Sequence, residues 1–201
     1  MNGLQCYNAK QDISQVAIRT MPDNRSDLAA LVYDDVHDPD ALLRGFAAEM
    51  NAQGFRVVGM VQAGQCADSS LSAVLVHSGE TLLLAQDFDP NASGCRLDIG
   101  RLQNAGARVA DALDAGADLL IINRFGKRER DGKGLGYLIE RALHAGTPVV
   151  IAVAKDRSAD WTAFAGDTPR LACDRSALDA WWRDVSARTS NWPRPNVSAR
   201  R

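Results

Sequence analysis

The sequence contains no long apolar run and no strong excess of charge of one sign. No stretch reaches the roughly 18 to 20 apolar residues that a membrane-spanning helix needs. The polar start MNGLQCYNAKQDISQ also lacks the apolar middle of a secretory signal. A net charge of -2 over 201 residues provides no overall attraction to nucleic acid or to an anionic membrane. We therefore expect a cytoplasmic protein whose partner is neither nucleic acid nor a membrane.

Cysteine is scarce, and the cysteines that occur lie far apart. They are Cys6, Cys66, Cys95 and Cys173, and no two have the close spacing of a metal-binding pair. In a reducing cytoplasm they stay as thiols. This pattern argues against a cysteine zinc site, and the sequence identifies no cofactor.

Glycine is missing where a nucleotide-binding protein would keep its phosphate loop. The segment LVYDDVHDPDALL, residues 31–43, follows a short apolar run but has no glycine, no lysine and no Ser or Thr. A phosphate loop needs all three, to turn backbone N–H groups toward the phosphates, to neutralise them and to hold magnesium. The four carboxylates of this segment would instead repel a polyphosphate.

The same acidic segment allows two readings. Asp34, Asp35, His37 and Asp38 offer oxygen ligands and an imidazole to a divalent metal. Alternatively, Asp38 or a neighbour caps the following helix, Asp40 complements its positive end, and His37 holds no ligand.

What the chain does contain is an alternation of short apolar runs with helical patterns, which is typical of parallel βαβ units. We predict a three-layer α/β sandwich with a mostly parallel sheet, in which the central strand 117–123 is flanked by strands 28–33 and 148–153. Further strands are expected at 55–61 and 170–173, with a hairpin at 72–76 and 81–85. Helices are expected to begin near Pro39, Asp98 and Leu135, and a terminal helix to contain Trp181 and Trp182. The predicted organisation is an N-terminal extension (1–27), one domain (28–187) and a C-terminal tail (188–201).

Polar residues follow several of the predicted strands. In an open α/β sheet, ligands bind outside the carboxyl ends of the strands. Asp34 and Asp35 follow the first strand, Gln62 the second, Asn123 and Arg124 the central one. These residues either line one site or are solvated strand ends.

The strongest local feature is NRFGKRERDGKGLG, residues 123–136, which places five cations within ten residues. Gly132 and Gly134 lie just before the predicted helix, where glycine lets backbone N–H groups approach an anion. We predict that Arg124, Lys127 and Lys133 surround such an anion and have no structural partner of their own. The alternative is a solvated basic loop whose glycines only make a turn.

Cys95 and Arg96 form a further candidate pair. A thiol beside a cation and a helix N-terminus can have a lowered pKa, which would favour a nucleophilic or ligand-binding role. Cysteine is also among the most commonly buried residues, and burial of Cys95 in the core is the simpler interpretation.

The order of the motifs GFRVVGMVQ, HSGETLLLAQ, GCRLD, ADLLIINRFGKRE and PVVIAVAKD resembles a bacterial domain-of-unknown-function family described as nucleoside-triphosphatase-like. The resemblance covers about residues 28–185. More distantly, the chain is similar to P-loop nucleoside triphosphatases and to the adaptor protein of molybdopterin guanine dinucleotide synthesis. Those relatives end the first strand in a phosphate loop and the central strand in an Asp-Glu pair, where this chain has residues 34–38 and Asn123-Arg124. The resemblance implies a P-loop-like topology with a hairpin insertion and a degenerate phosphate loop. Because members of the family are often encoded near genes for molybdate uptake or molybdenum enzymes, it also implies a role with an oxyanion or the molybdenum cofactor.

Three functional hypotheses follow. The favoured one is a non-hydrolysing protein that binds a small anion, such as molybdate or a phosphorylated cofactor. The second is a nucleotide-dependent hydrolase or transferase with a rearranged site, and the third is an interaction module that uses Trp181 and Trp182. A homo-oligomer is compatible with any of them. The candidate ligand-binding residues are Asp34, Asp35, Gln62, Cys95, Arg96, Asn123, Arg124, Lys127, Gly132, Lys133 and Gly134.

Overall fold

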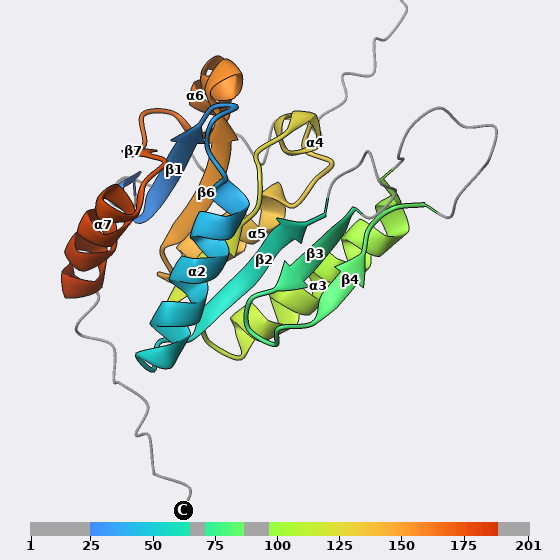
Figure 1. The fold of residues 1–201 in the computed structure, drawn as a ribbon, viewed down its shortest axis with the longest axis horizontal. Coiled ribbons are helices and arrows are strands. Elements are labelled where there is room, and N and C mark those ends of the chain that lie inside the picture. Colours follow the sequence, from blue (N-terminus) through green and yellow to red (C-terminus); the bar gives the residue numbers. More distant parts are fainter. Residues whose placement is uncertain (1–24, 65–70, 87–96, 189–201) are drawn as a thin grey trace, which may run out of the picture.

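The structure, a computed structural model, describes residues 25–64, 71–86 and 97–188 (Figure 1). None of the helices in these ranges has both the length and the apolar character that a membrane span requires. The strands are β1 (Leu28–Tyr33), β2 (Val57–Ala63), β3 (Ser72–Leu75), β4 (Thr81–Leu83), β5 (Leu119–Ile122), β6 (Val149–Ala154) and β7 (Arg170–Ala172). The helices are η1 (Arg25–Asp27), α2 (Pro39–Ala52), α3 (Ile99–Asp114), α4 (Lys127–Arg130), α5 (Gly136–His144), η3 (Lys155–Arg157), α6 (Ser158–Ala165) and α7 (Arg175–Arg188).

The described strands form one seven-stranded sheet in the order β4-β3-β2-β5-β6-β1-β7. All neighbours from β2 to β7 pair in parallel. β3 pairs antiparallel with both β2 and β4, as expected of a hairpin added beside β2. The fold is therefore a mostly parallel α/β sheet, consistent with a P-loop nucleoside-triphosphatase-like topology, and the predicted fold class is confirmed.

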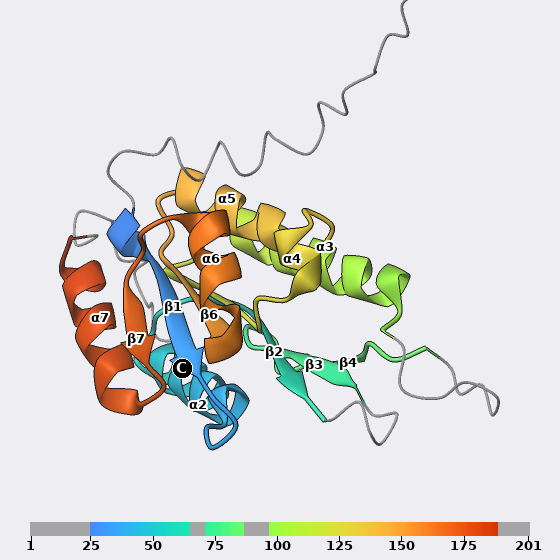
Figure 2. The ribbon, with the colours of Figure 1, turned by 90° about the horizontal axis from the view of Figure 1, so that it is seen from above.

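Helices cover both faces of the sheet, so the sheet is the middle one of three layers (Figures 1 and 2). On one face, Phe46 of α2 and Leu178 of α7 pack with alternate residues of the central strands. On the other face, Leu102 of α3, Leu138 of α5 and Trp161 of α6 pack with the remaining ones. The central strands are nearly continuous apolar runs because both of their faces are buried in this way.

The predicted neighbours of the central strand were wrong in one respect. β5 lies between β2 and β6, and β1 lies on the far side of β6. β1, β5 and β6 are all interior strands, as predicted, while β4 and β7 form the edges. The apolar runs of these strands are too alike to indicate which pairs with which, so the sequence pattern predicts burial but not order.

Trp181 and Trp182 do not form a surface patch. Both residues belong to α7, and each is only 7% exposed. The indole N–H of Trp181 donates to the Ser26 carbonyl at 3.0 Å, and the Trp182 ring meets Phe55 edge-on with centroids 5.2 Å apart. The interaction module that relied on these two side chains is therefore not supported, because both belong to the core.

Candidate functional site

The parallel strands end at one edge of the sheet, which is where α4 lies (Figure 1). Their register aligns Tyr33 with Ala154 and Met60 with Ile122. The segments that follow β1 and β5 meet there, because Arg124 contacts Asp40 across 84 positions of sequence. The polar residues that follow β1 and β5 therefore lie close together at this edge. A ligand can use only those that are not already bound within the protein.

The acidic segment after β1 uses its own carboxylates to satisfy its backbone. Asp34 accepts the Val36 N–H at 3.3 Å and pairs with the His37 imidazole, and Asp38 accepts the Ala41 N–H at 2.9 Å as the cap of α2. The hydrogen bond from His37 is the main reason why the pKa of Asp34 lies below its ordinary value. The helix-cap reading of Asp38 is confirmed. Within the described ranges, no three His, Cys, Asp or Glu side chains are grouped so that they could hold a metal ion.

Arg124 is a structural ion-pair partner, contrary to the prediction that it has none. Its Nη2 lies 2.7 Å from Oδ2 of Asp40, and its Nε lies 3.4 Å from Oδ1. Its guanidinium carbon lies 5.5 Å from the centroid of the Tyr33 ring. Burial lowers the pKa of Arg124, but the hydrogen bond and charge of Asp40 outweigh it and leave the pKa above its ordinary value. Arg124 also has a φ of 29°, which a non-glycine residue seldom adopts and which this anchoring maintains.

Gln62, Asp35 and Asn123 also lie at or near the carboxyl ends of the strands. The Gln62 amide donates to the Gly64 carbonyl at 3.3 Å, and Asp35 is exposed. Asn123 Oδ1 is buried and has no hydrogen-bond partner among the described residues. Cys95 and Arg96 lie outside the described residues. Among the described candidates, Gln62 near the end of β2 and Asn123 directly after β5 belong to neighbouring strands.

The basic segment is not a simple loop, because Lys127–Arg130 forms the short helix α4. Glu129, a residue of α4, is buried, and its carboxylate binds the backbone on both sides of the helix. Its Oε2 accepts the Gly126 N–H at 3.0 Å, and its Oε1 accepts the Leu135 N–H at 3.1 Å. A Cβ on Gly134 would lie 2.1 Å from Glu129 Oε1, so that glycine is required by this carboxylate. The N–H group at the start of α5, which was expected to face a ligand, thus receives the protein's own anion.

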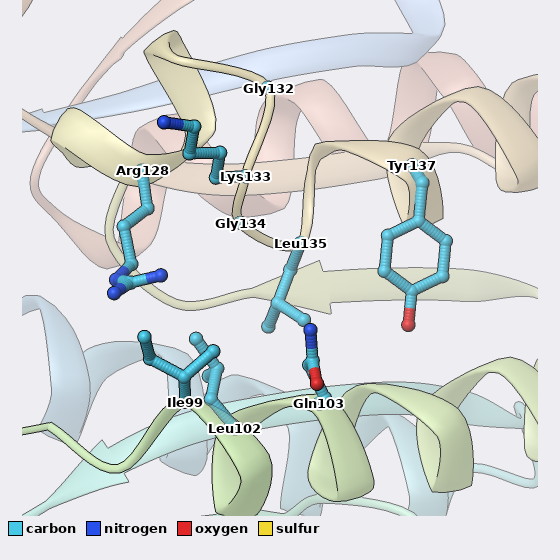
Figure 3. Close-up of a pocket in the computed structure, with 9 residues that line it drawn as sticks. All are labelled: Ile99, Leu102, Gln103, Arg128, Gly132, Lys133, Gly134, Leu135 and Tyr137. Atoms are coloured by element: carbon cyan, nitrogen blue, oxygen red, sulfur yellow. The ribbon is translucent and has the colours of Figure 1, made fainter.

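A cavity of about 480 Å³ opens between α3 and the α4–α5 connection (Figure 3). The predicted Gly132, Lys133 and Gly134 line it, whereas Arg124 and Lys127 do not. The Lys133 N–H donates to the Arg128 carbonyl at 2.8 Å, which keeps these two basic residues close together. We call this cavity the α3–α5 pocket; its lining residues are Ile99, Leu102, Gln103, Arg128, Gly132, Lys133, Gly134, Leu135 and Tyr137.

The five cations of the basic segment divide into two groups. Arg124 is paired with Asp40. Arg130 is paired through its Nε with Oδ1 of Asp131 at 3.1 Å and through its Nη1 with Oδ2 of Asp160 at 3.2 Å. Lys127, Arg128 and Lys133 have no ion-pair partner in the part of the chain that the structure describes. Arg128 and Lys133 line the pocket, and none of the nine lining residues is acidic. The residues that line the pocket therefore contribute two positive charges and no negative one, while the Glu129 carboxylate, which does not line it, binds the Leu135 N–H.

Several lining residues were missed by the sequence reasoning. Arg128 was noted only as one cation of the basic segment, and Gln103 and Tyr137 gave no recognisable signal. Ile99 had one, because it continues the apolar stripe of α3 one turn before Leu102. Since Ile99 is 45% exposed, this stripe extends beyond the area that the sheet covers.

Comparison with known proteins finds a curated relative and a matching family model. The chain is 34% identical over 166 residues to the molybdenum import ATP-binding protein ModC 2 of Bradyrhizobium diazoefficiens, an alignment that covers 80% of this chain and 18% of that protein. The chain thus spans less than a fifth of the length of this curated relative. No solved structure matches. Residues 28–181 match the family model "Protein of unknown function (DUF2478)", so the chain belongs to the DUF2478 family.

Proposed function

We propose that this chain is a non-hydrolysing, P-loop-like domain that binds a small anion in the α3–α5 pocket and serves molybdenum metabolism. The anion would be an oxyanion such as molybdate or a phosphorylated cofactor. One observation carries the proposal: Arg128 and Lys133 line a cavity together, without an acidic residue in its wall.

The electrostatics of the pocket favour an anionic ligand. Arg128 and Lys133 are the two charged residues among those that line the pocket, so an anion bound there would meet positive charge without a carboxylate of the lining competing for it. Charge-assisted hydrogen bonds of this kind contribute roughly 1.5 to 3 kcal/mol each.

The acidic segment after β1 supports the non-hydrolysing part of the proposal. Asp34 and Asp38 already occupy the N–H groups of Val36 and Ala41, which a phosphate loop would direct at its ligand. At the end of β5, Arg124 is held by Asp40. The alternative is a nucleotide-dependent hydrolase or transferase in which Asp34, Asp35 or Cys95 acts, and neither Asp34 nor Asp35 lines the α3–α5 pocket.

The relative ModC 2 supports the metabolic context. Its name is that of an ATP-binding protein of molybdenum import, and the similarity covers most of this chain. We extend to this chain only the connection with molybdenum, because the aligned region is a minor part of that protein.

Titration calorimetry with sodium molybdate, sulfate and phosphate tests the proposal. Arg128→Ala and Lys133→Ala should each weaken binding about tenfold, which corresponds to a loss of about 1.4 kcal/mol. Lys127→Ala is the matched control, because it removes the same charge from the same segment but from outside the pocket. If Lys127→Ala weakens binding as strongly, or if none of these anions and no phosphorylated compound binds, the proposal is wrong.

A phosphate-release assay tests the absence of hydrolysis separately. With ATP or GTP and magnesium, the chain should show no turnover in the range of about 1 to 1000 per second that enzymes usually reach. Turnover in that range that is abolished by Asp34→Ala or Asp35→Ala would establish the hydrolase instead.

A further inference from the structure

Resting on the proposed anion site, we infer that the α3–α5 pocket takes a flat ring system that carries a phosphate, in preference to a bare oxyanion. The phosphate lies at the Arg128 and Lys133 end, and the ring lies against the apolar wall formed by α3, Leu135 and Tyr137. The inference combines the size of the pocket, its apolar wall and the arrangement of its polar groups.

The cavity is too large for a bare oxyanion. Its volume is about 480 Å³, within the range of roughly 300 to 1,000 Å³ that is usual for pockets of cofactor-sized ligands. A water molecule takes up roughly 30 Å³ of liquid volume, and a tetrahedral oxyanion is only a few times larger. An oxyanion bound by Arg128 and Lys133 would leave most of the apolar wall exposed to water.

The apolar wall itself indicates a ligand surface. Ile99 is 45% exposed and Tyr137 is 44% exposed, and the two lie in one wall and not singly on the surface. Both line the pocket, together with the buried side chains of Leu102 and Leu135. A flat ring placed against this wall would remove apolar area from water, at roughly 25 cal/mol for each Å² buried.

The polar groups of the pocket are separated in a way that matches such a ligand. Figure 3 shows Arg128 at one end, Tyr137 at the other, and Leu135 and Gln103 between them. The Gln103 amide can both donate and accept hydrogen bonds, as can the Tyr137 hydroxyl, so they suit the heteroatoms at the edge of a ring. The cations are at the opposite end, where the phosphate would be.

The apolar wall is held in place by close packing on α3. A Cβ on Gly106 would lie 2.6 Å from Leu135 Cδ2 and 2.7 Å from the Tyr137 hydroxyl oxygen. The absence of a side chain at Gly106 therefore lets both residues settle against α3. A wall that is formed before the ligand arrives lowers the entropic cost of binding.

Calorimetry with matched phosphate compounds tests the inference. AMP, GMP and riboflavin 5′-phosphate carry a flat aromatic ring system, whereas ribose 5-phosphate carries the same phosphate group on a sugar without one. At least one of the three ring compounds should bind about tenfold more tightly than ribose 5-phosphate. Tyr137→Ala should remove that advantage and leave the affinity for ribose 5-phosphate unchanged, whereas Lys133→Ala should weaken both.

The outcomes separate this inference from the proposed function. If ribose 5-phosphate binds as tightly as every ring compound and Lys133→Ala still weakens it, the ring is irrelevant and only the proposed function stands. If a ring compound binds better but Tyr137→Ala does not reduce the advantage, the ring lies elsewhere and the inference is overturned. If none of the four compounds and no oxyanion binds, both proposals fail.

Discussion

The acidic segment after β1 and the α3–α5 pocket are both concentrations of charge beside helix N-termini, and they differ in whether the protein supplies the opposite partner. In the acidic segment, Asp34 and Asp38 bind backbone N–H groups of their own segment, and Asp40 binds Arg124. In the pocket, Arg128 and Lys133 have no carboxylate among the lining residues. We therefore propose the α3–α5 pocket as the anion site in preference to the acidic segment, because no carboxylate among its lining residues neutralises its cations.

The basic segment, residues 123–136, also contains both charges that are bound within the fold and charges that are not. Glu129, Arg124 and Arg130 serve the fold, since each binds another part of the protein. Arg128 and Lys133, from the same stretch of sequence, are among the residues that line the cavity. The following predictions test this division between structural and ligand-binding charges.

Glu129→Ala should cause the largest effect, a loss of about 3 kcal/mol in the free energy of unfolding. It leaves the N–H groups of Leu135 and Gly126 without their acceptor, and an unsatisfied buried donor costs roughly 1 to 3 kcal/mol. Urea denaturation measures this loss, with Arg128→Ala as the control that should change stability by less than about 0.5 kcal/mol. A loss below about 1 kcal/mol would mean that Glu129 does not organise the α4–α5 connection.

Asp40→Ala should cost about 2 kcal/mol, intermediate between an exposed and a fully buried ion pair. The Asp40 side chain is 13% exposed and that of Arg124 is 40% exposed, so solvent screens only one side of the pair. A double-mutant cycle with Arg124→Ala should give a coupling free energy of about 1 kcal/mol or more. Additive losses from the two substitutions would show that the pair contributes nothing.

Arg124→Ala and Lys133→Ala should have opposite consequences, although each removes one cation from the basic segment. Arg124→Ala should reduce stability and leave the affinity for molybdate or a phosphate compound unchanged, because Arg124 does not line the pocket. Lys133→Ala should weaken that affinity about tenfold while the melting temperature stays nearly constant. Measuring affinity and melting temperature on both variants would refute the division if the two variants behaved alike.

The smallest expected effect is a pH dependence confined to the acidic segment. The pKa of Asp34 lies below its model-compound value of 3.8, mainly because of the hydrogen bond from His37. A lowered carboxyl pKa stabilises the fold above the unfolded pKa, and this contribution is lost as the pH falls through the lower, folded value. In His37→Ala, an NMR titration of the Asp34 carboxyl carbon should therefore show the pKa moving up toward 3.8. An unchanged titration curve would exclude His37 as the cause.

The layers of the fold were predictable because they depend on local patterns. Apolar runs marked β1, β5 and β6, and the spacing of apolar residues marked α2 and α3. The order of the strands depends on crossover connections, and runs of similar composition carry no information about them.

The candidate site was only half predictable for a related reason. The cations of residues 124–133 are plain in the sequence, but their partners are not. Asp40 lies 84 residues from Arg124, and Asp160 lies 30 residues from Arg130. The apolar wall comes from Ile99 and Leu102, on a helix that precedes the basic segment. Only the folded chain shows which cations remain available to a ligand.

Backbone NMR during a titration with molybdate and with riboflavin 5′-phosphate tests the central claim most directly, because it locates the anion. We expect the largest amide shift changes with either compound at residues 99–103 and 128–137, around the α3–α5 pocket, and we expect Lys133→Ala to raise the concentration at their midpoint about tenfold. Largest changes at residues 34–41 would contradict the central claim, since they would place the anion at the acidic segment after β1, where a phosphate loop would lie.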